Sequence, residues 1–394
     1  MGNNRQSRPR RLLLCLDGVP HTLIEQAKNR GLFDSFGSPS RLLSPFPTMT
    51  NVALSAMLGA SPPAGYESLY FDRTARELRG GIRKYIGRRT PDKIPSSYMD
   101  DLDYQEPLPF EFLIYVAPEK VWRADMQRFR ERFKAAPQTR DYFAFLKATD
   151  GLLHAQGPDR LAVALESLDK ILKEIRAFCG NETEIVMFSD HGMNLEENRR
   201  VDLASTLQRR GFRVVIPAFG LCSYAALYCQ DDPRIPEIAS ASVEVKGIDF
   251  AVYKDAGAVV VESTRGRARI EYDSAVDSYR YLKVSGDPLE LGSFPEGFAT
   301  DAEWFKRTAA HRYPNAVANI YKSLFTPRVK HTADVLLSLH DGYYYGWSPF
   351  GRFVRLAATH GNALQGSSNA FLMSTHQQLP AYIRADEART YLRH

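Results

Sequence analysis

The stretch RLLLCLDGV, residues 11–19, decides the fold. Its apolar run is five residues long and ends directly at Asp17 and Gly18. Such a short run, closed by a turn signal, is typical of a strand buried on both faces of a parallel sheet. The stretch therefore predicts a buried strand with a loop at its carboxyl end.

A second stretch, TEIVMFSDHGM at residues 183–193, has the same form and ends in Asp190 and His191. Between the two, residues 158–180 carry apolar side chains at helical spacing, with a proline at the start and a glycine at the end. Strands that alternate with such helices indicate an α/β fold with a doubly wound, mostly parallel sheet flanked by helices. Ligands of these folds bind beyond the carboxyl ends of the strands, where Asp17 is also expected.

The pattern of apolar and turn-forming residues changes after about residue 225. Residues 250–284 alternate β-branched and aromatic runs with turns, which predicts an antiparallel meander. Helices are expected within 304–325, and a hairpin is expected to turn at Asp341 and Gly342. This pattern predicts an α+β cap inserted into the α/β core.

We therefore divide the chain into a catalytic core of residues 1–230 and 346–394 and a cap of residues 231–345. Within the core, residues 66–135 are rich in arginine, tyrosine and proline. We expect them to form an irregular insertion that covers the same face as the cap.

Composition narrows the class of protein. The chain has 51 basic and 46 acidic residues, a slight excess that is spread along the sequence and does not favour a nucleic-acid partner. No stretch is long enough to span a membrane, and the first apolar run is too short for a secretion signal. The four cysteines lack metal-type spacing and are predicted to be reduced packing residues. We expect a cytoplasmic protein with neither a membrane nor a nucleic-acid partner.

Four short segments, CLDG, ATDGLLHAQG, FSDHGM and ATHGNA, supply carboxylates and imidazoles after apolar runs. Divalent metals need such ligands, and acidic groups are costly to bring together unless a cation offsets their charge. Each segment alone could be a solvated loop or a helix cap, but the four together predict a metal site. The candidate ligands are Asp17, Asp150, His154, Asp190, His191 and His360.

Residues 46–63, FPTMTNVALSAMLGASPP, place two threonines before an apolar stretch with helical spacing. Either threonine could cap that helix or carry out chemistry. A threonine hydroxyl is a poor nucleophile at neutral pH and needs a metal or a base to lower its pKa. The candidate metal ligands would meet that need.

The order of these motifs resembles the alkaline phosphatase superfamily, in particular its type I phosphodiesterase/nucleotide pyrophosphatase branch. The shared motifs are a strand-end Asp, Pro-Thr-x-Thr, Asp-x-x-x-His, Ser-Asp-His-Gly and Thr-His-Gly, and they span residues 17–361. The resemblance covers the core, while residues 66–135 and 230–345 match less distinctly. It implies an alkaline phosphatase-like fold and two divalent metal ions, zinc or alternatively manganese.

The resemblance also implies a role for each candidate. Thr50, rather than Thr48, takes the position of the nucleophile, because ALSAMLGASPP aligns with the family's segment without a gap. Thr50 and Asn51 would lie at the amino end of a helix that runs to about Leu58, where a phosphoryl group is favoured. One metal would be held by Asp17, Thr50, Asp190 and His191. The other would be held by Asp150, His154 and His360. The alternative reading of Thr50 is a plain helix N-cap.

One departure limits the prediction of the substrate. In the family an asparagine that helps to hold the phosphate follows the nucleophile helix, but this chain has Phe71 and Asp72 there. Arg73, Arg79 or a residue of the cap could replace it.

We expect a phosphodiesterase or nucleotide pyrophosphatase that acts on a small phosphate ester through a phosphorylated threonine. The alternatives are a phosphomonoesterase or phosphonate hydrolase of the same superfamily, and, in another class, a non-catalytic binding protein stabilised by its metals. A sulfatase is disfavoured because the chain lacks a Cys/Ser-x-Pro-x-Arg motif at residues 50–54.

Overall fold

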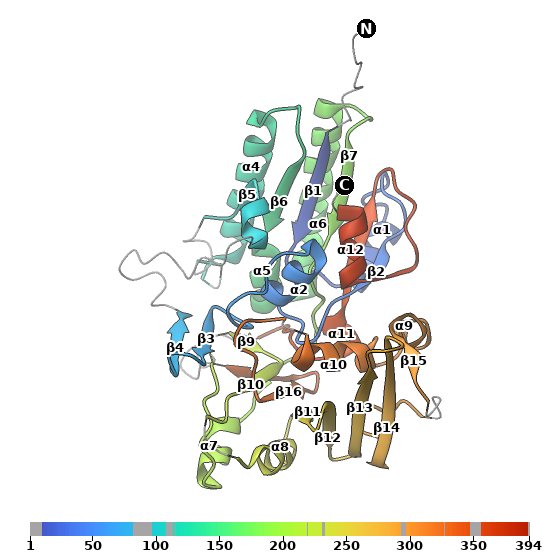
Figure 1. Ribbon diagram of the computed structural model, residues 1–394. Helices are drawn as coiled ribbons and strands as arrows, with labels where there is room; N and C mark the ends of the chain where they lie inside the picture. Colours follow the sequence, from blue (N-terminus) through green and yellow to red (C-terminus); the bar gives the residue numbers. More distant parts are fainter. Residues whose placement is uncertain are drawn as a thin grey trace.

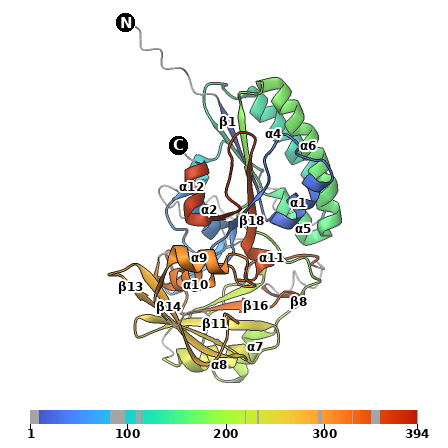
Figure 2. The same cartoon turned by 90° about the vertical axis from the view of Figure 1, so that its right-hand side faces the viewer.

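The chain folds around two large sheets, each with helices on both faces (Figures 1 and 2). The computed structural model describes residues 10–81, 97–107, 113–114, 116–218, 220–230, 233–292, 297–326, 328–346 and 356–392.

The first sheet is centred on β1 (Arg11–Leu16), which pairs in parallel with β6 (Tyr142–Leu146) and β7 (Glu184–Phe188). The strand order is β19-β2-β18-β7-β1-β6-β5. The outer strands are β2 (Ser40–Leu43), β5 (Tyr104–Gln105), β18 (Asn369–Ser374) and β19 (Tyr382–Arg384). Only β18 runs against the others, because it pairs in antiparallel fashion with both β7 and β2. The predicted mostly parallel sheet is confirmed.

Helices cover both faces of this sheet. One face carries α1 (His21–Asn29), α4 (Pro118–Ala135), α5 (Ala148–Gln156) and α6 (Pro158–Cys179), and the other carries α2 (Thr50–Leu58) and α12 (Ala385–Leu392). Successive side chains of a strand point to opposite faces. Leu12 and Leu14 therefore join the core beneath α4 and α6, while Leu13 and Cys15 join the core beneath α2 and α12. Burial on both faces explains why β1 is apolar without alternation.

The second sheet is antiparallel, with the order β10-β16-β11-β12-β13-β14-β15. Its core residues lie against α9 and α10 on one face and α7 and α8 on the other. The predicted meander is confirmed as β11 to β14. The strands are β10 (Tyr224–Leu227), β11 (Ile248–Asp255), β12 (Ala258–Ser263), β13 (Gly266–Asp273), β14 (Ser278–Gly286), β15 (Ala299–Thr300) and β16 (Val335–Leu339). The helices are α7 (Leu203–Arg209), α8 (Ile235–Val243), α9 (Asp301–Thr308) and α10 (Ala316–Phe325).

The predicted hairpin at Asp341 and Gly342 is wrong. The chain does turn there, but β17 (Tyr343–Gly346) pairs with β8 (Arg199–Arg200) and β9 (Leu221–Cys222). Strand β16 is already hydrogen-bonded on both edges, to β10 and β11, so it has no edge left for β17.

The predicted irregular insertion is wrong in part. Residues 118–135 form α4, which has a proline in its first turn and buries its apolar face in the first core. The rest of the described insertion holds short elements: β3 (Leu69–Asp72), β4 (Glu77–Gly80) and the 3₁₀ helix η2 (Tyr98–Asp101). The remaining short helix of the described chain is α11 (Gln365–Ser368). The division into core and cap stays a prediction.

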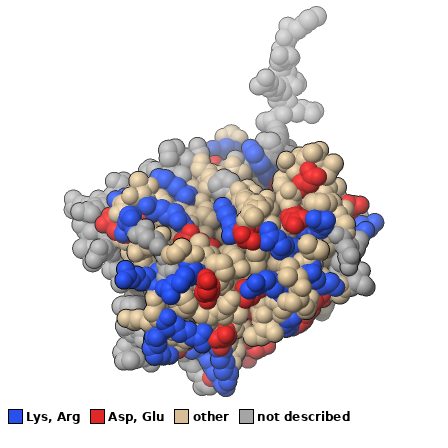
Figure 3. Space-filling model, turned by 60° about the horizontal axis from the view of Figure 1, so that its bottom comes forward, with Lys and Arg blue, Asp and Glu red and all other residues tan. Residues whose placement is uncertain are grey.

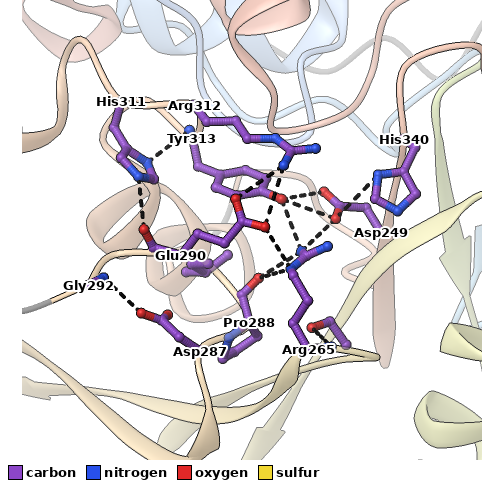
Figure 4. Close-up of polar contacts among 12 residues, drawn as sticks. Asp249, Arg265, Asp287, Pro288, Glu290, Gly292, His311, Arg312, Tyr313 and His340 are labelled. Atoms are coloured by element: carbon purple, nitrogen blue, oxygen red, sulfur yellow. Dashed lines mark hydrogen bonds and ion pairs between the residues drawn. The ribbon is translucent and has the colours of Figure 1, made fainter.

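An ion pair joins the buried carboxylate of Asp249 on β11 to Arg265, which is partly exposed in the turn between β12 and β13 (Figure 4). Arg265 Nη2 lies 2.6 Å from Asp249 Oδ1, and the Tyr313 hydroxyl donates to both Asp249 oxygens at 3.1 and 3.0 Å. His340 Nδ1 lies 3.5 Å from the same carboxylate. We call Asp249, Arg265, Tyr313 and His340 the Asp249 cluster.

The molecular surface carries charges of both signs. Figure 3 shows basic side chains spread across one face with acidic side chains between them. This agrees with the small net charge of +5. The absence of a nucleic-acid partner stays a prediction.

Candidate metal and phosphoryl-transfer site

Three aspartates meet at the carboxyl edge of the first sheet. Asp17 follows β1, Asp190 follows β7, and Asp150 lies in the first turn of α5, just after β6. The Gly18 amide donates to Asp190 Oδ1 at 3.0 Å. Gly18 has a φ of +69°, and a Cβ atom there would lie 2.9 Å from Asp150 Oδ1. Glycine is therefore needed at this turn to let the three carboxylates converge.

The first candidate ligand group consists of Asp17, Asp190 and His191, whose ligand atoms all lie within 4.8 Å of one another. His191 Nε2 is 3.5 Å from Asp17 Oδ1 and 3.2 Å from Asp190 Oδ2. The other ring nitrogen, Nδ1, bonds to the Gly192 carbonyl at 3.0 Å. A backbone partner on one nitrogen orients the other nitrogen towards the carboxylates.

The second group consists of Asp150, His191 and His360. His360 Nε2 lies 3.6 Å from Asp150 Oδ1, and the His360 ring stacks on that of His191 with a centroid distance of 3.8 Å. His360 Nδ1 bonds to the Thr48 carbonyl at 2.8 Å. The ring is thus fixed in the same manner as that of His191.

His154 lies one helical turn after Asp150 on α5, so the two side chains share a face of the helix. Its Nε2 is 3.3 Å from Asp150 Oδ1, and its Nδ1 bonds to the Ala358 carbonyl at 2.8 Å. The structure therefore gathers all six predicted ligands in one place. Their division between two metals stays a prediction, because His191 is close to both groups.

The carboxylates at this site are incompletely satisfied. Among the residues that the structure describes, one buried oxygen each of Asp17, Asp150 and Asp190 accepts no hydrogen bond, although imidazole nitrogens lie within 3.3 Å of those of Asp150 and Asp190. Burial and the neighbouring acidic charges raise the pKa of Asp17, and burial raises the pKa of Asp190 to about 6. Buried acids with unused lone pairs are the donors that a divalent cation needs.

The histidines complete this donor set. Burial lowers the pKa of His191 to about 4 and that of His360 to about 3. Both rings are therefore neutral near pH 7, which is the form that binds metals. Burial opposes the charge on Asp150, but the imidazoles around it lower its pKa below the ordinary value. The residues present are chemically suited to divalent cations.

Thr50 is the first residue of α2, and its hydroxyl points into the site. Its Oγ1 lies 3.3 Å from Asp17 Oδ1 and 3.2 Å from His191 Nε2. The N-cap of α2 is Met49, whose side chain makes no capping hydrogen bond, and the described contacts of the Thr50 hydroxyl are with Asp17 and His191. The alternative that Thr50 is a plain N-cap is therefore wrong.

Thr48 has a role that the sequence reasoning missed. Its hydroxyl donates to the Asn362 carbonyl at 3.0 Å and accepts from the Gly361 amide at 2.9 Å. Together with its carbonyl, which bonds to His360, it fastens the loop that carries this histidine. The spacing of Thr48 and His360 in the sequence gives no signal of this contact.

The two arginines suggested as substitutes for the missing asparagine are held elsewhere. Arg73 Nη2 lies 2.6 Å from Asp334 Oδ1, and Arg79 Nη1 lies 3.0 Å from Asp72 Oδ2. Asp72 also accepts the amides that close the turn after β3. None of the contacts observed for these arginines reaches the candidate ligands.

A mostly parallel sheet that gathers three aspartates, three histidines and a helix-start threonine at its carboxyl edge is the arrangement of alkaline phosphatase-like enzymes that hydrolyse phosphoric esters. The sequence matches the type I phosphodiesterase / nucleotide pyrophosphatase family over residues 68–335, and the chain belongs to this family. It is therefore a hydrolase acting on phosphoric ester bonds. The matched range contains Asp150, His154, Asp190 and His191, while Asp17, Thr50 and His360 lie outside it.

Solved structures show the same fold at low sequence identity. Phosphonoacetate hydrolase from Sinorhizobium meliloti has 14% identity and a TM-score of 0.57, with 99% of this chain and 97% of that chain covered. Murine ectonucleotide pyrophosphatase / phosphodiesterase 5 has 11% identity and a TM-score of 0.54, with 97% and 94% covered. The human protein of that name has 12% identity and a TM-score of 0.53, with 97% and 93% covered.

No curated protein matches the chain at a significant level. Within the described part of the chain, every helix is too short or too polar to span a bilayer.

Proposed function

We propose that the protein is a phosphodiesterase or nucleotide pyrophosphatase that acts through a phosphothreonine at Thr50, or its nucleotidyl or phosphodiester equivalent, and depends on two divalent metal ions. Zinc is the preferred metal and manganese the alternative. The observation that carries the proposal is the Thr50 hydroxyl, which caps no helix and lies within 3.3 Å of both Asp17 and His191. A purely structural metal site has no need of a hydroxyl in this position.

The metals would be held by the six ligands and Thr50. Asp17, Asp190 and His191 would hold one metal together with Thr50, and Asp150, His154 and His360 would hold the other. When bound, two such cations lower the pKa of a hydroxyl or a water molecule and offset the charge that develops on the oxygens of an in-line displacement.

The residues of the chain then define two steps. In the first, Thr50 Oγ1 attacks phosphorus, and its new P–O bond forms as the bond to the leaving group breaks. The hydroxyl proton passes towards Asp17 Oδ1, and the leaving group departs after taking up a proton from solvent. With a diester substrate the threonine then carries a phosphodiester, and with a monoester it carries a phosphomonoester. In the second step, water attacks this intermediate, the bond from phosphorus to Thr50 Oγ1 breaks, and one proton of the water restores the threonine hydroxyl. Asn51 and the free amides at the start of α2 hold the phosphoryl oxygens throughout.

The structural relatives support this choice. Murine ectonucleotide pyrophosphatase / phosphodiesterase 5 is inactive in a variant with one threonine replaced by alanine, and that variant binds AMP. Phosphonoacetate hydrolase binds phosphonoformate and phosphonoacetate, which keeps phosphonate hydrolysis as the second candidate. Phosphomonoesters are a further candidate substrate. We propose a cytoplasmic enzyme for a small phosphate ester, with neither a membrane nor a nucleic-acid partner. A non-catalytic binding protein is the alternative of another class.

The test is a Thr50→Ala variant beside Thr50→Ser as the matched control. Both are loaded with zinc or manganese and assayed with bis-(p-nitrophenyl) phosphate, p-nitrophenyl phosphate and phosphonoacetate. We expect Thr50→Ala to lose at least about 1,000-fold in kcat/KM while keeping about two metal ions, and Thr50→Ser to keep measurable turnover. Equal turnover by Thr50→Ala and the wild type would remove Thr50 from the mechanism.

A further inference from the structure

The side chain of Asn51, directly after Thr50, is held at one end only. Its Oδ1 accepts a hydrogen bond from the Tyr98 hydroxyl at 2.9 Å. Its Nδ2 has no hydrogen-bond partner among the residues that the structure describes. An amide has a donor end and an acceptor end, so a bond to Oδ1 fixes where Nδ2 points.

Tyr98 is built into the protein as a rigid support for this amide. It is the first residue of η2, and it is only 6% exposed, within the apolar core shared by α2 and the first sheet. Burial raises the pKa of Tyr98 above its ordinary value, so the hydroxyl keeps the proton that it donates. Because the ring is packed in this core, the hydroxyl is held at a fixed distance from Asn51 Oδ1.

Asn51 could take the role of the phosphate-holding asparagine that the family has and this chain lacks. Residues 71 and 72 are Phe71 and Asp72, and Asp72 is engaged with Arg79 and with backbone amides of the β3–β4 turn. An amide donor beside the nucleophile is the chemical equivalent of the missing side chain. The described site offers it one residue after Thr50, on the same first turn of α2.

We propose that Tyr98 is a positioning residue that orients Asn51, so that Nδ2 donates to a non-bridging oxygen of the phosphoryl group on Thr50. This inference rests on the proposed function of Thr50. It assigns to the neighbour of the nucleophile a role that the family pattern gives to a residue further along the chain.

The test is a double-mutant cycle with Tyr98→Phe and Asn51→Ala. Tyr98→Phe keeps the ring and removes one neutral hydrogen bond, so we expect kcat/KM to fall about 5-fold. Loss of the amide in Asn51→Ala should lower kcat/KM about 30-fold. Because Tyr98 acts through Asn51, Tyr98→Phe should have no further effect in the Asn51→Ala background. Metal content should be unchanged in all four proteins.

Tyr104→Phe is the matched control. Tyr104 is also a buried tyrosine of the insertion, but its hydroxyl donates to Asp125 on α4 and contacts no candidate ligand. We expect its kcat/KM to equal that of the wild type. If Tyr98→Phe leaves kcat/KM unchanged, or lowers it equally with and without Asn51, the positioning role is overturned.

A second readout separates this inference from the proposed function. The same cycle is measured as the affinity of the metal-loaded protein for inorganic phosphate by calorimetry, which needs no turnover. We expect Tyr98→Phe to weaken phosphate binding about 3-fold in the presence of Asn51 and not in its absence. If Thr50→Ala is active and the coupling between Tyr98 and Asn51 is still measured, the nucleophile assignment is wrong and the positioning role stands. If Thr50 is essential but Tyr98 and Asn51 are not coupled, only the positioning role of Tyr98 is wrong.

Discussion

Two clusters of charged residues, each built around a buried aspartate, are arranged in opposite ways. In the Asp249 cluster, a single carboxylate receives an arginine and a tyrosine hydroxyl, and both of its oxygens are occupied. At the carboxyl edge of the first sheet, three carboxylates crowd together, and an oxygen of each accepts no hydrogen bond from the described part of the chain.

This contrast distinguishes a structural cluster of charges from a functional one. A paired, hydrogen-bonded charge is stable as it stands, whereas like charges with unused lone pairs are costly to bury. The second arrangement is stable when cations bind to it. The distinction predicts opposite responses to the same substitution of aspartate by asparagine.

The largest contrast is expected in activity. Asp17→Asn removes a candidate metal ligand and the acceptor of the Thr50 hydroxyl, so kcat/KM should fall at least about 1,000-fold. Asp249→Asn, assayed at a temperature at which the variant is fully folded, should change kcat/KM by less than about 3-fold. The observed contacts of Asp249 are with Arg265, Tyr313 and His340 and not with the candidate metal ligands. Assays with bis-(p-nitrophenyl) phosphate and metal analysis of both variants check this. Comparable losses of activity would erase the distinction.

The second largest effect is expected from metal removal, measured as a change in the free energy of unfolding. If the native state binds the cations and the unfolded chain does not, a metal concentration of about 1,000 times Kd stabilises the fold by about 4 kcal/mol per site. Urea unfolding in excess zinc and in chelator measures this difference. Asp249→Asn should show the same difference as the wild type, and Asp17→Asn should show a smaller one. A wild type that is insensitive to chelator would count against a metal site.

The third contrast concerns the sign of a stability change. Asp249→Asn removes the carboxylate that Arg265 and the Tyr313 hydroxyl share, while Arg265 keeps Glu290 and the Pro288 carbonyl as partners, and it should destabilise the protein by about 2 kcal/mol. In the metal-free protein, Asp17→Asn relieves repulsion between buried acids and should stabilise it by about 1 kcal/mol. Both values come from unfolding curves in chelator. Destabilisation of similar size in both variants would show that the two clusters are alike.

The smallest effect is a pH dependence. In the metal-free protein the pKa of Asp190 is about 6, above its ordinary 3.8. Its contribution to stability is therefore complete below pH 3.8 and is lost as the pH rises through 6. Asp190→Asn lacks this titration. Its free energy of unfolding relative to the wild type should rise between pH 3.8 and about 6, by at most about 1.4 kcal/mol per pH unit. A constant difference across this range would contradict the assignment.

The sequence was sufficient for the elements whose patterns are local. Strand β1, strand β7 and helix α6 follow from continuous apolar runs and helical spacing, and α2 ends at Leu58 as expected. Asp17, Asp150 and Asp190 could be found because each follows a parallel strand, and such strand ends lie along one edge of the sheet. His154 follows from its helical spacing to Asp150, whereas His360 is brought in by a loop.

The remaining features depend on contacts between distant parts of the chain. Strand β17 cannot pair with β16, because both edges of β16 are already hydrogen-bonded to β10 and β11. The local sequence of the turn at Asp341 gives no sign of this. The hydrogen bond from Tyr98 to Asn51 joins residues 47 positions apart. Helix α4 was not predicted. The arginine, tyrosine and proline content of its segment indicated an irregular insertion, although the buried residues of the helix follow helical spacing.

The most direct test of the account is a crystal structure of the zinc-soaked protein with anomalous data collected at the zinc edge. We expect two peaks about 4 Å apart, one beside Asp17, Asp190 and Thr50 and the other beside Asp150 and His360. Zinc peaks only on the protein surface, with none among these residues, would contradict it.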